Sequence, residues 1–464
     1  MTRLLVRYPA SYEPERRYAI DVVLGTLLGL DHRAEPHDGA ATVIALEGAG
    51  DGRKVTVADG LFALPESEWL EPASLPAGPL PRWRVTDDVP EALTAGEDLP
   101  VLFGARQGPW LTQDEHGLRL GVDVFGTALF MLARYEELVA TERDRHGRFP
   151  AAASLAAREG FLERPVVDEH VEALWACLRR LWPGLERRPR RPRLLVSHDV
   201  DWPLSPRDGL AATLRSAVGA AVRTGPAAAA AHLRAYAARV ARRPDLDPYD
   251  TFDMIMDATE SLGARSAFYF IAGRTAGRLD GDHDLRDPWV MGLVRRVAER
   301  GHEVGLHPSY GSFRDPAQVR RELERLLAAA DELGVEQDEW GGRQHFLRWE
   351  APTTWRAWAD AGLAYDSSLG YADRVGFRSG TCHEHEVFDL RARRRLPLRE
   401  RPLVVMEATL LERKYMGLGH EAAVETARRL RATCERFGGD FTLLWHNSYL
   451  LTAADRQAFR RVIA

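Results

Sequence analysis

Short apolar runs alternate with helical patterns through the C-terminal half of the chain. The runs, which are typical of buried strands, fall at residues 194–197, 266–271, 302–307, 344–347, 403–408 and 441–446. Apolar residues at helical spacing separate most of them, at residues 251–262, 288–300, 316–333, 353–361 and 422–437. Strands separated by helices predict parallel βαβ units, and this number of repeats favours a barrel over an open sheet. In such barrels the chemistry lies where strands end and loops begin.

The N-terminal part is patterned differently. Apolar runs at residues 41–46 and 99–103 accompany one helical pattern at residues 123–139, whose apolar side chains share a face. This mixture predicts a smaller α/β or α+β domain that acts as scaffold.

A basic, proline-containing run, ERRPRRPR at residues 186–193, marks the boundary between the two parts. The chain has 464 residues, and single hydrophobic cores usually stop growing at about 250–300 residues. We therefore predict an N-terminal accessory domain at residues 1–190 and a barrel domain at residues 191–464. The run itself predicts a solvated linker, with a polyanion-binding arm as the alternative.

The formal net charge is −6, so the molecule as a whole has no basic field to collect nucleic acid. The cysteines, Cys177, Cys382 and Cys434, are far apart and odd in number, which fits a reducing compartment. The first twenty residues lack the pattern of a signal peptide, and no apolar stretch approaches the ~20 residues of a membrane span. We expect a cytoplasmic protein, and the oligomeric state stays open.

Two further segments attract attention. The alanine-rich stretch at residues 211–241 is interrupted by arginines, which predicts an amphipathic pair of surface helices, with a membrane-surface role as the alternative.

The run CHEHE at residues 382–386 has metal-binding residue types, but strand alternation would separate its histidines from its cysteine. We expect a solvated or substrate-facing loop there.

Polar residues gather at the predicted strand ends. In LLVSHDVD, a period of two places Asp199 and Asp201 on one face. His307 ends a second strand, the segment GGRQHF is expected to place Arg343 and His345 on one face, and His446 ends the last strand. Any one of these residues has a structural alternative, such as a solvated turn for the aspartates. Together they predict a metal site with an acid and a base.

The ordered segments SHDVD, GHEVGLHPSYGS, GGRQHFLRW, GLAYDSSLGYADRVGFRSGTC and LLWHNS resemble a divergent branch of the NodB-like polysaccharide deacetylases (carbohydrate esterase family 4-like). The resemblance covers roughly residues 193–448 and implies a distorted (β/α) barrel. Through GVDVFGTALFMLARYEE and RPVVDEH, the N-terminal part resembles an uncharacterised accessory domain that precedes such barrels.

The resemblance implies a metal site. Asp201 takes the place of the metal-binding aspartate, although Val200 separates it from Asp199 where the family has adjacent residues, and His307 matches the first metal histidine. The family's second histidine, four residues later, is replaced by Gly311. We expect His345 to replace it. Zinc is the expected divalent metal, and cobalt, manganese or iron also accept such ligands.

The resemblance also implies catalytic roles. Asp199 matches the base, Arg343 the arginine that orients it, and His446 the general acid. For substrate binding, Asp366 and Arg378 are expected to contact sugar hydroxyls, with turn capping as the alternative. Glu407, in an otherwise apolar strand, is expected to point into the barrel mouth and to partner the metal or a substrate.

These residues predict a hydrolase acting on a non-peptide C–N bond, which removes the acetyl group of an N-acetylated sugar or glycan by attack of a metal-bound water. Two alternatives stay open. One is a metal-dependent hydrolase of a cyclic amide on the same barrel. The other is a non-catalytic glycan-binding or assembly protein with a decayed metal site.

Overall fold

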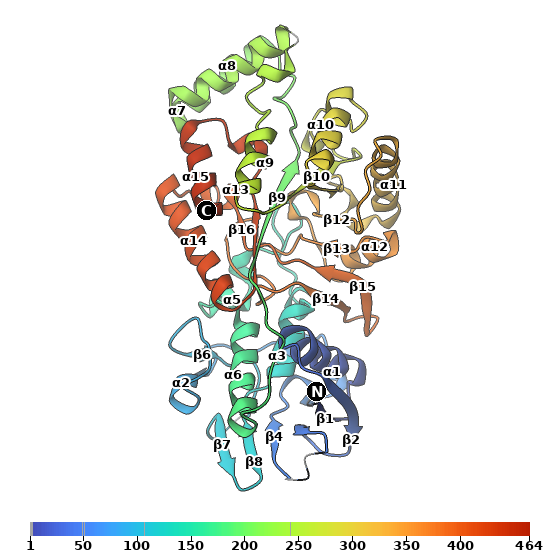
Figure 1. Cartoon of the computed structure of the whole chain (residues 1–464), viewed down its shortest axis with the longest axis vertical. Coiled ribbons are helices and arrows are strands. Elements are labelled where there is room, and N and C mark those ends of the chain that lie inside the picture. The colour runs from blue at the N-terminus through green and yellow to red at the C-terminus, as the bar shows by residue number, and fades with distance from the viewer. Residues whose placement is uncertain (1–2, 49, 51, 106, 242) are drawn as a thin grey trace. The chain divides into compact units, whose positions relative to one another are not determined.

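The computed structural model describes residues 3–48, 50, 52–105, 107–241 and 243–464 (Figure 1). The chain forms two compact units: the first comprises residues 1–192, 376–402 and 433–440, and the second comprises residues 193–375, 403–432 and 441–464. The predicted boundary at residue 190 lies close to the first division. The sequence did not reveal that two later segments belong to the first unit. Phe388 and Leu390 explain one of them, because both are buried in the N-terminal core.

The first unit contains a mixed six-stranded sheet of order β2-β1-β3-β4-β8-β7. β1 runs parallel to β2, and β4 runs parallel to β8, whereas the remaining neighbours are antiparallel. This unit also holds the short β5–β6 pair and the antiparallel β14–β15 pair. Its strands are β1 (Leu4–Pro9), β2 (His32–His37), β3 (Thr42–Leu46), β4 (Lys54–Val57), β5 (Arg82–Trp83), β6 (Leu99–Pro100), β7 (Leu111–Asp114), β8 (Gly117–Leu120), β14 (His385–Asp389) and β15 (Arg394–Glu400).

The helices of the first unit include one break that the sequence pattern did not predict. They are α1 (Glu13–Ile20), α2 (Val85–Asp88), α3 (Val124–Leu132), α4 (Tyr135–Val139), α5 (Leu155–Arg158) and α6 (Val166–Leu181). The single helix expected at residues 123–139 ends at Leu132 and resumes at Tyr135. Between them Arg134 has a left-handed backbone (φ 54°), and its buried guanidinium donates to the Met131 carbonyl and to Glu137. These bonds stabilise the break.

The second unit is built on parallel strands in the order β13-β12-β11-β10-β9-β17-β16. They are β9 (Arg193–Val200), β10 (Ser266–Ile271), β11 (Glu303–His307), β12 (Gly341–Gly342), β13 (Tyr365–Asp366), β16 (Val405–Met406) and β17 (Asp440–Leu444). The α/β class with parallel strands is thereby confirmed. Within the described residues no pairing joins β13 to β16, so the unit shows an open order where a closed barrel was predicted.

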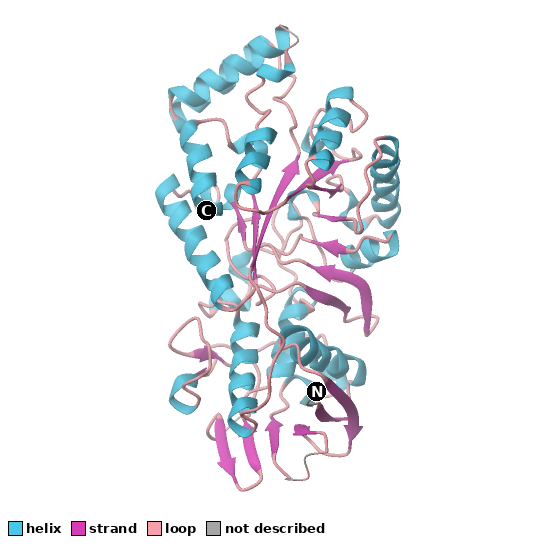
Figure 2. Cartoon of the chain, in the orientation of Figure 1, coloured by secondary structure: helices cyan, strands magenta, loops and turns pink. Residues whose placement is uncertain are grey.

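Helices surround these strands (Figure 2). They are α7 (Leu210–Thr224), α8 (Pro226–Val240), α9 (Phe252–Glu260), α10 (Pro288–Glu299), α11 (Pro316–Glu332), α12 (Thr353–Ala361), α13 (Glu407–Leu411), α14 (His420–Arg436) and α15 (Ala453–Ile463). The predicted strand at residues 266–271 and the predicted helix at residues 353–361 match the observed bounds. The alanine-rich stretch forms the predicted helix pair, α7 and α8.

One predicted strand is wrong, and another is shorter than predicted. Residues 344–347 lie beyond the short strand β12, and His345–Leu347 form a 3-10 turn. The run at residues 403–408 is a strand only at Val405–Met406, after which Glu407 begins α13. Both runs are short and apolar, and such runs do not distinguish a strand from a buried turn of helix.

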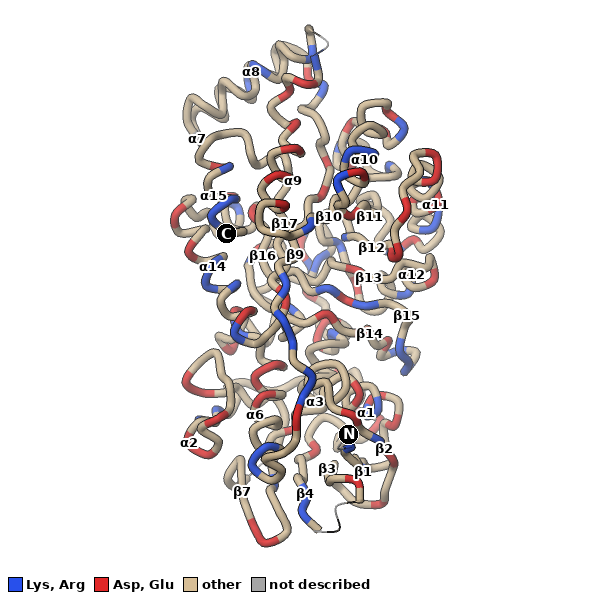
Figure 3. Tube along the Cα trace, viewed as in Figure 1, with Lys and Arg blue, Asp and Glu red and all other residues tan. Residues whose placement is uncertain are grey.

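Basic and acidic residues are interspersed along both units (Figure 3). Among the described residues, no helix combines the length and apolar character needed to cross a bilayer.

Candidate metal centre

The carboxyl ends of parallel strands bring the predicted polar residues together. Asp199 lies near the end of β9, with Asp201 just beyond it, and His307 ends β11. His307 Nε2 lies 3.1 Å from Asp201 Oδ1 and 3.7 Å from Asp199 Oδ2. Because the period of a strand is two, the intervening Val200 turns away and both carboxylates face the same histidine. The expected convergence of the two aspartates is therefore present.

A glycine allows the next segment to reach this point. A Cβ atom on Gly342 would lie 1.9 Å from the carbonyl oxygen of Leu306, so only glycine permits this approach of β12 to β11. Arg343 N then donates to Leu306 O at 3.1 Å. His345 follows in the turn. Arg343 and His345 do not share a strand face as predicted, because the strand ends at Gly342, yet both side chains enter the site.

Three potential ligand atoms form a tight triangle. His345 Nδ1 lies 2.7 Å from His307 Nε2 and 3.2 Å from Asp201 Oδ1, and His307 Nε2 lies 3.1 Å from the same oxygen. Ligands about 2.0–2.2 Å from a tetrahedral ion are separated from one another by about 3.3–3.6 Å, so the triangle is slightly tighter than a loaded site. Both histidines are 1% exposed.

The protonation of the two histidines supports metal binding. His307 Nδ1 lies 2.6 Å from the Arg343 carbonyl, and His345 Nε2 lies 2.7 Å from the Leu279 carbonyl. Since a carbonyl oxygen only accepts, each of these outer nitrogens donates a proton to its carbonyl, and the inner nitrogens face Asp201 and each other. This is how histidine ligands are oriented by their surroundings in metal sites.

The electrostatic environment of the Asp201–His307–His345 triangle favours positive charge. Burial acts to lower the pKa of His345, but the negative charge of Asp201 and the hydrogen bonds to Asp201 and to the Leu279 carbonyl together outweigh it and raise that pKa above the usual value. Burial acts in the opposite sense on Asp201, and the positive charge of His345 holds the pKa of this carboxyl well below its usual range. Within the described residues, Asp201 Oδ1 is buried and accepts no hydrogen bond of good geometry. The donor set therefore fits a divalent cation.

Asp199 is held by Arg343 on the other side of the site. Arg343 Nη1 donates to Asp199 Oδ1 at 2.9 Å, while Nε and Nη2 donate to the carbonyl and hydroxyl oxygens of Ser367 at 2.8 and 3.0 Å. The guanidinium also lies over the ring of Tyr269, 5.1 Å from its centroid. Arg343 is fully buried, so Asp199 is a fixed, paired carboxylate.

His446 lies just beyond the end of β17 and is oriented by Glu407. Its Nδ1 atom lies 2.6 Å from Glu407 Oε1, and its Nε2 atom lies 3.6 Å from Asp201 Oδ2. Burial opposes the imidazolium, but the charge and hydrogen bond of Glu407, together with the charges of Asp201 and Asp199, outweigh it and raise the pKa of His446 to about 10. Glu407, expected to partner a metal or a substrate, thus contacts the histidine instead.

The other two predicted substrate residues have partners of their own. Asp366 is fully buried and accepts from Ser368 N at 3.0 Å, which corresponds to the turn-capping alternative. Arg378 belongs to the first unit, where its guanidinium donates to both carboxylate oxygens of Glu137. The structure therefore does not place Arg378 beside the metal ligands.

Gly311 lies close to the side chain of Thr275. A Cβ atom there would lie 2.9 Å from Thr275 Oγ1, which accepts the Gly311 N–H at 2.7 Å. His345 supplies the second imidazole from a strained turn, because Phe346 and Leu347 both have left-handed backbones (φ 60° and 53°). Such strain costs about 1–3 kcal/mol per residue and clusters at functional sites.

Sequence reasoning missed the residues that fix these loops. Ser368 Oγ accepts from Gln344 N at 2.8 Å, next to the Arg343–Ser367 bonds. Asp280 accepts from the backbone N–H groups of Thr275, Ala276 and Tyr310 at 2.6–2.8 Å. No strand-end rule finds them, since the Ser368–Gln344 and Asp280–Tyr310 bonds join segments that are 24 and 30 residues apart.

A second group of potential ligands lies in the first unit and has another explanation. The carboxylate of Asp168 accepts from Thr381 Oγ1 at 2.6 Å and from Cys382 N and Sγ at 3.0 and 3.2 Å. The Arg190 guanidinium contacts His383 Nδ1. Hydrogen-bond donors already occupy the Asp168 carboxylate, and the Arg190 guanidinium occupies His383. We therefore interpret this group as a structural hydrogen-bond network.

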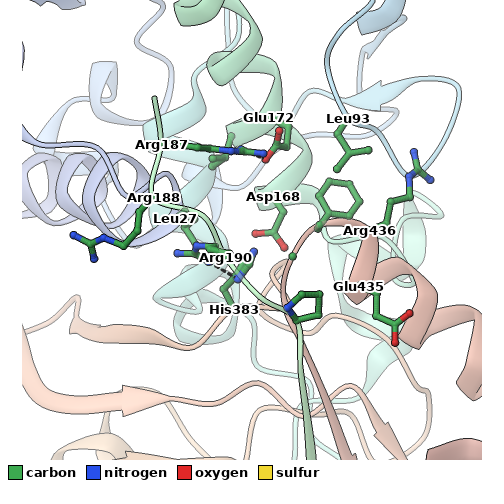
Figure 4. A pocket seen from close by; sticks show the side chains of 14 residues that line it. Leu27, Leu93, Asp168, Glu172, Arg187, Arg188, Arg190, His383, Glu435 and Arg436 are labelled. Carbon is green, nitrogen blue, oxygen red and sulfur yellow. Dashed lines mark hydrogen bonds and ion pairs between the residues drawn. The ribbon is translucent and has the colours of Figure 1, made fainter. Parts of the chain in front are cut away.

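Asp168 and His383 line a cavity of about 220 Å³ in the first unit (Figure 4). Arg187 and Arg190 of the linker also line it, and Arg187 pairs with Glu172 at 2.5 Å. The expectation of a solvated linker is confirmed, because seven of the eight residues 186–193 are exposed. The expectation of a solvated loop at residues 382–386 is wrong, because Cys382, His383 and His385 are buried.

Comparisons with known proteins leave the chain without a close relative. Residues 4–183 match DUF7033, a family of unknown function. No curated protein matches. Among solved structures, a protein described as a polysaccharide deacetylase from Mycobacterium smegmatis is 19% identical, with a TM-score of 0.36 over 60% of this chain and 86% of that one. Puue allantoinase is 13% identical, with a TM-score of 0.37 over 68% of this chain and 90% of that one. At such TM-scores the likeness carries no conclusion.

Proposed function

We propose that the second unit is a metal-dependent hydrolase that cleaves the amide C–N bond of an N-acetylated sugar or glycan. The triangle of His307 Nε2, His345 Nδ1 and Asp201 Oδ1 carries this proposal, since both outer imidazole nitrogens are held by backbone carbonyls. The order of the sequence motifs supports the deacetylase reaction and the distorted barrel of that family.

The three residues of the triangle would hold the metal. Two imidazoles and a carboxylate suit zinc, and they also accept cobalt, manganese or iron. When bound, such an ion supplies a Lewis acid that polarises the amide carbonyl and makes a water molecule more acidic.

Asp199 is the proposed base. Its position next to His307 places it within reach of a water at the triangle, and Arg343 fixes the orientation of its carboxylate. Arg343 acts as a positioning residue. Its Nε and Nη2 atoms are bound to Ser367, and its guanidinium plane packs on the Tyr269 ring.

His446 is the proposed acid. The Glu407 carboxylate holds Nδ1, which leaves Nε2 directed toward Asp201 and the site. At neutral pH the imidazole is protonated, because its pKa is raised to about 10. It can therefore give a proton to the departing amine, which an amide nitrogen needs in order to leave.

The test combines metal analysis with product analysis. We expect one divalent metal ion per chain in protein purified without chelator, and loss of that metal in His345→Ala and His307→Ala. His116→Ala is the matched control, since His116 lies on the exposed surface of the first unit. Asp199→Asn should keep the metal and abolish acetate release from N-acetylated sugar oligomers.

The outcomes separate the alternatives. Ring opening of a cyclic amide without acetate release would support the other hydrolase reaction. Wild-type protein that binds no zinc, cobalt, manganese or iron would contradict the proposal and favour a glycan-binding protein.

A further inference from the structure

The helical hairpin α7–α8 of the second unit is packed in an unusual way. Its two helices meet through small side chains: Ala217, Ala220, Ala228, Ala231, Ala235 and Ala238 are all buried. The large apolar side chains face outward instead. A helical hairpin whose outer face is in water is expected to bury its leucines and valines and to expose its alanines. Burial of the larger side chains gains more free energy.

The outward-facing side chains form a continuous stripe on α7. Leu210, Leu214, Val218 and Val222 follow one another at i,i+4 positions, which are neighbours on a helix surface. Val218 is 66% exposed and Val222 is 80% exposed. On α8, Leu233 and Val240 are also exposed and lie seven residues apart, on one face.

The exposed apolar residues are concentrated here. Of the ten large hydrophobic residues that are exposed within the described part of the chain, seven lie between Leu210 and Leu246. Scattered exposed leucines are normal on a protein surface, whereas a contiguous group marks an interaction site.

The hairpin has one sign of charge. Residues 209–244 contain six arginines and neither aspartate nor glutamate, although the whole chain has a net charge of −6. In Figure 3, α7 and α8 show blue segments and no red ones. Arg215 and Arg234 are exposed beside the apolar positions. Such a combination of apolar and basic side chains is typical of helices that lie in the interface of an anionic bilayer.

The hairpin is attached firmly to the second unit at its base. Arg239 donates to the carbonyl oxygens of Pro206, at 2.7 Å, and Asp208. Arg278 donates to the Asp208 carboxylate at 2.9 Å. The hairpin is inserted directly after the strand that presents Asp199 and Asp201. Binding of the hairpin to a surface would therefore hold the metal centre near that surface, because only a short segment of chain separates the two.

We propose that the α7–α8 hairpin docks the protein on the surface of a membrane that contains anionic lipids, with the outward leucines and valines inserted among the lipid chains. A second copy of the chain is the less favourable occupant. In a symmetric dimer the two hairpins would meet with their own arginines, and like charges at an interface oppose association.

The experiment measures binding of the full chain to vesicles by sedimentation. We expect the wild type to bind phosphatidylcholine vesicles that contain phosphatidylglycerol, to bind pure phosphatidylcholine vesicles more weakly, and to lose affinity at high salt. Leu214→Gln/Val218→Gln should weaken binding by about tenfold or more, because two inserted apolar side chains are lost. Arg215→Gln/Arg234→Gln should remove the preference for anionic vesicles.

The matched control is Leu262→Gln/Leu327→Gln, which removes two exposed leucines outside the hairpin and should leave binding unchanged. Circular dichroism checks that every variant is folded. Equal binding by the wild type and Leu214→Gln/Val218→Gln would overturn the proposal, as would a wild type that binds neither kind of vesicle. A wild-type dimer that this variant dissociates, without vesicle binding, would also overturn it in favour of self-association.

Discussion

Replacement of Arg343 by methionine should destabilise the second unit strongly. The side chain of Asp199 is 4% exposed, and its Oδ1 atom accepts from Arg343 at 2.9 Å. Removing one partner of a buried ion pair leaves a desolvated charge and costs about 3–5 kcal/mol. The bonds to Ser367 are lost as well, and each contributes about 0.5–1.5 kcal/mol. We therefore expect the free energy of unfolding to fall by about 4 kcal/mol or more.

The assay is urea-induced unfolding of the intact chain, followed by circular dichroism. Arg314→Met is the control, because Arg314 makes an ion pair with Glu350 on the surface, and such exposed pairs contribute about 0.2–1 kcal/mol. Asp199→Asn/Arg343→Met should be about 2 kcal/mol more stable than Arg343→Met, since it removes the buried charge. If Arg343→Met costs no more than Arg314→Met, or if the double variant shows no recovery, the reasoning about the buried pair is refuted.

Two further predictions concern steric fit and pH. Gly311→His should not restore metal binding to His345→Ala and should itself destabilise the protein by about 1–3 kcal/mol, because its Cβ atom would lie 2.9 Å from Thr275 Oγ1; restored metal stoichiometry would contradict this. Burial lowers the pKa of His170 to about 4. Below pH 6.5 the unfolded chain therefore binds a proton at this residue that the folded chain does not bind, and the free energy of unfolding decreases as the pH falls from 6.5 to 4. The contribution of His170 is about 3 kcal/mol, and His170→Leu should reduce the stability lost between pH 7 and pH 4 by that amount in urea unfolding; an unchanged pH dependence would refute the assignment.

The strand ends were the most informative part of the sequence. The positions of Asp199 and Asp201 followed from a period of two, and that of His307 followed from its place at the end of an apolar run. These patterns are local, so they can be read without knowledge of the neighbouring segments. The structure places all three within one cluster, whereas their roles in a reaction remain proposals.

Contacts between segments far apart in the chain could not be predicted from the sequence. Glu407 was assigned to a strand facing a substrate, but it begins a helix and contacts His446. Arg378 was assigned to the same site as Asp199, but it is buried against Glu137 in the other unit. A single charged residue in an apolar run shows that a partner must exist, because an unpaired buried charge is costly. It does not show which partner.

The sequence alone was sufficient to predict the parallel α/β class and most helix bounds in the second unit, and it supplied a candidate boundary and candidate metal-binding residues. These depend on periodicity and residue type, which act over a few neighbouring positions. Three features emerged only from the folded chain: His345 reaches His307 from a turn beyond the strand, the hairpin exposes its large apolar side chains, and residues 376–402 join the first unit. Those outcomes depend on contacts between segments far apart in the chain, where packing and burial select among conformations that local patterns leave equally acceptable.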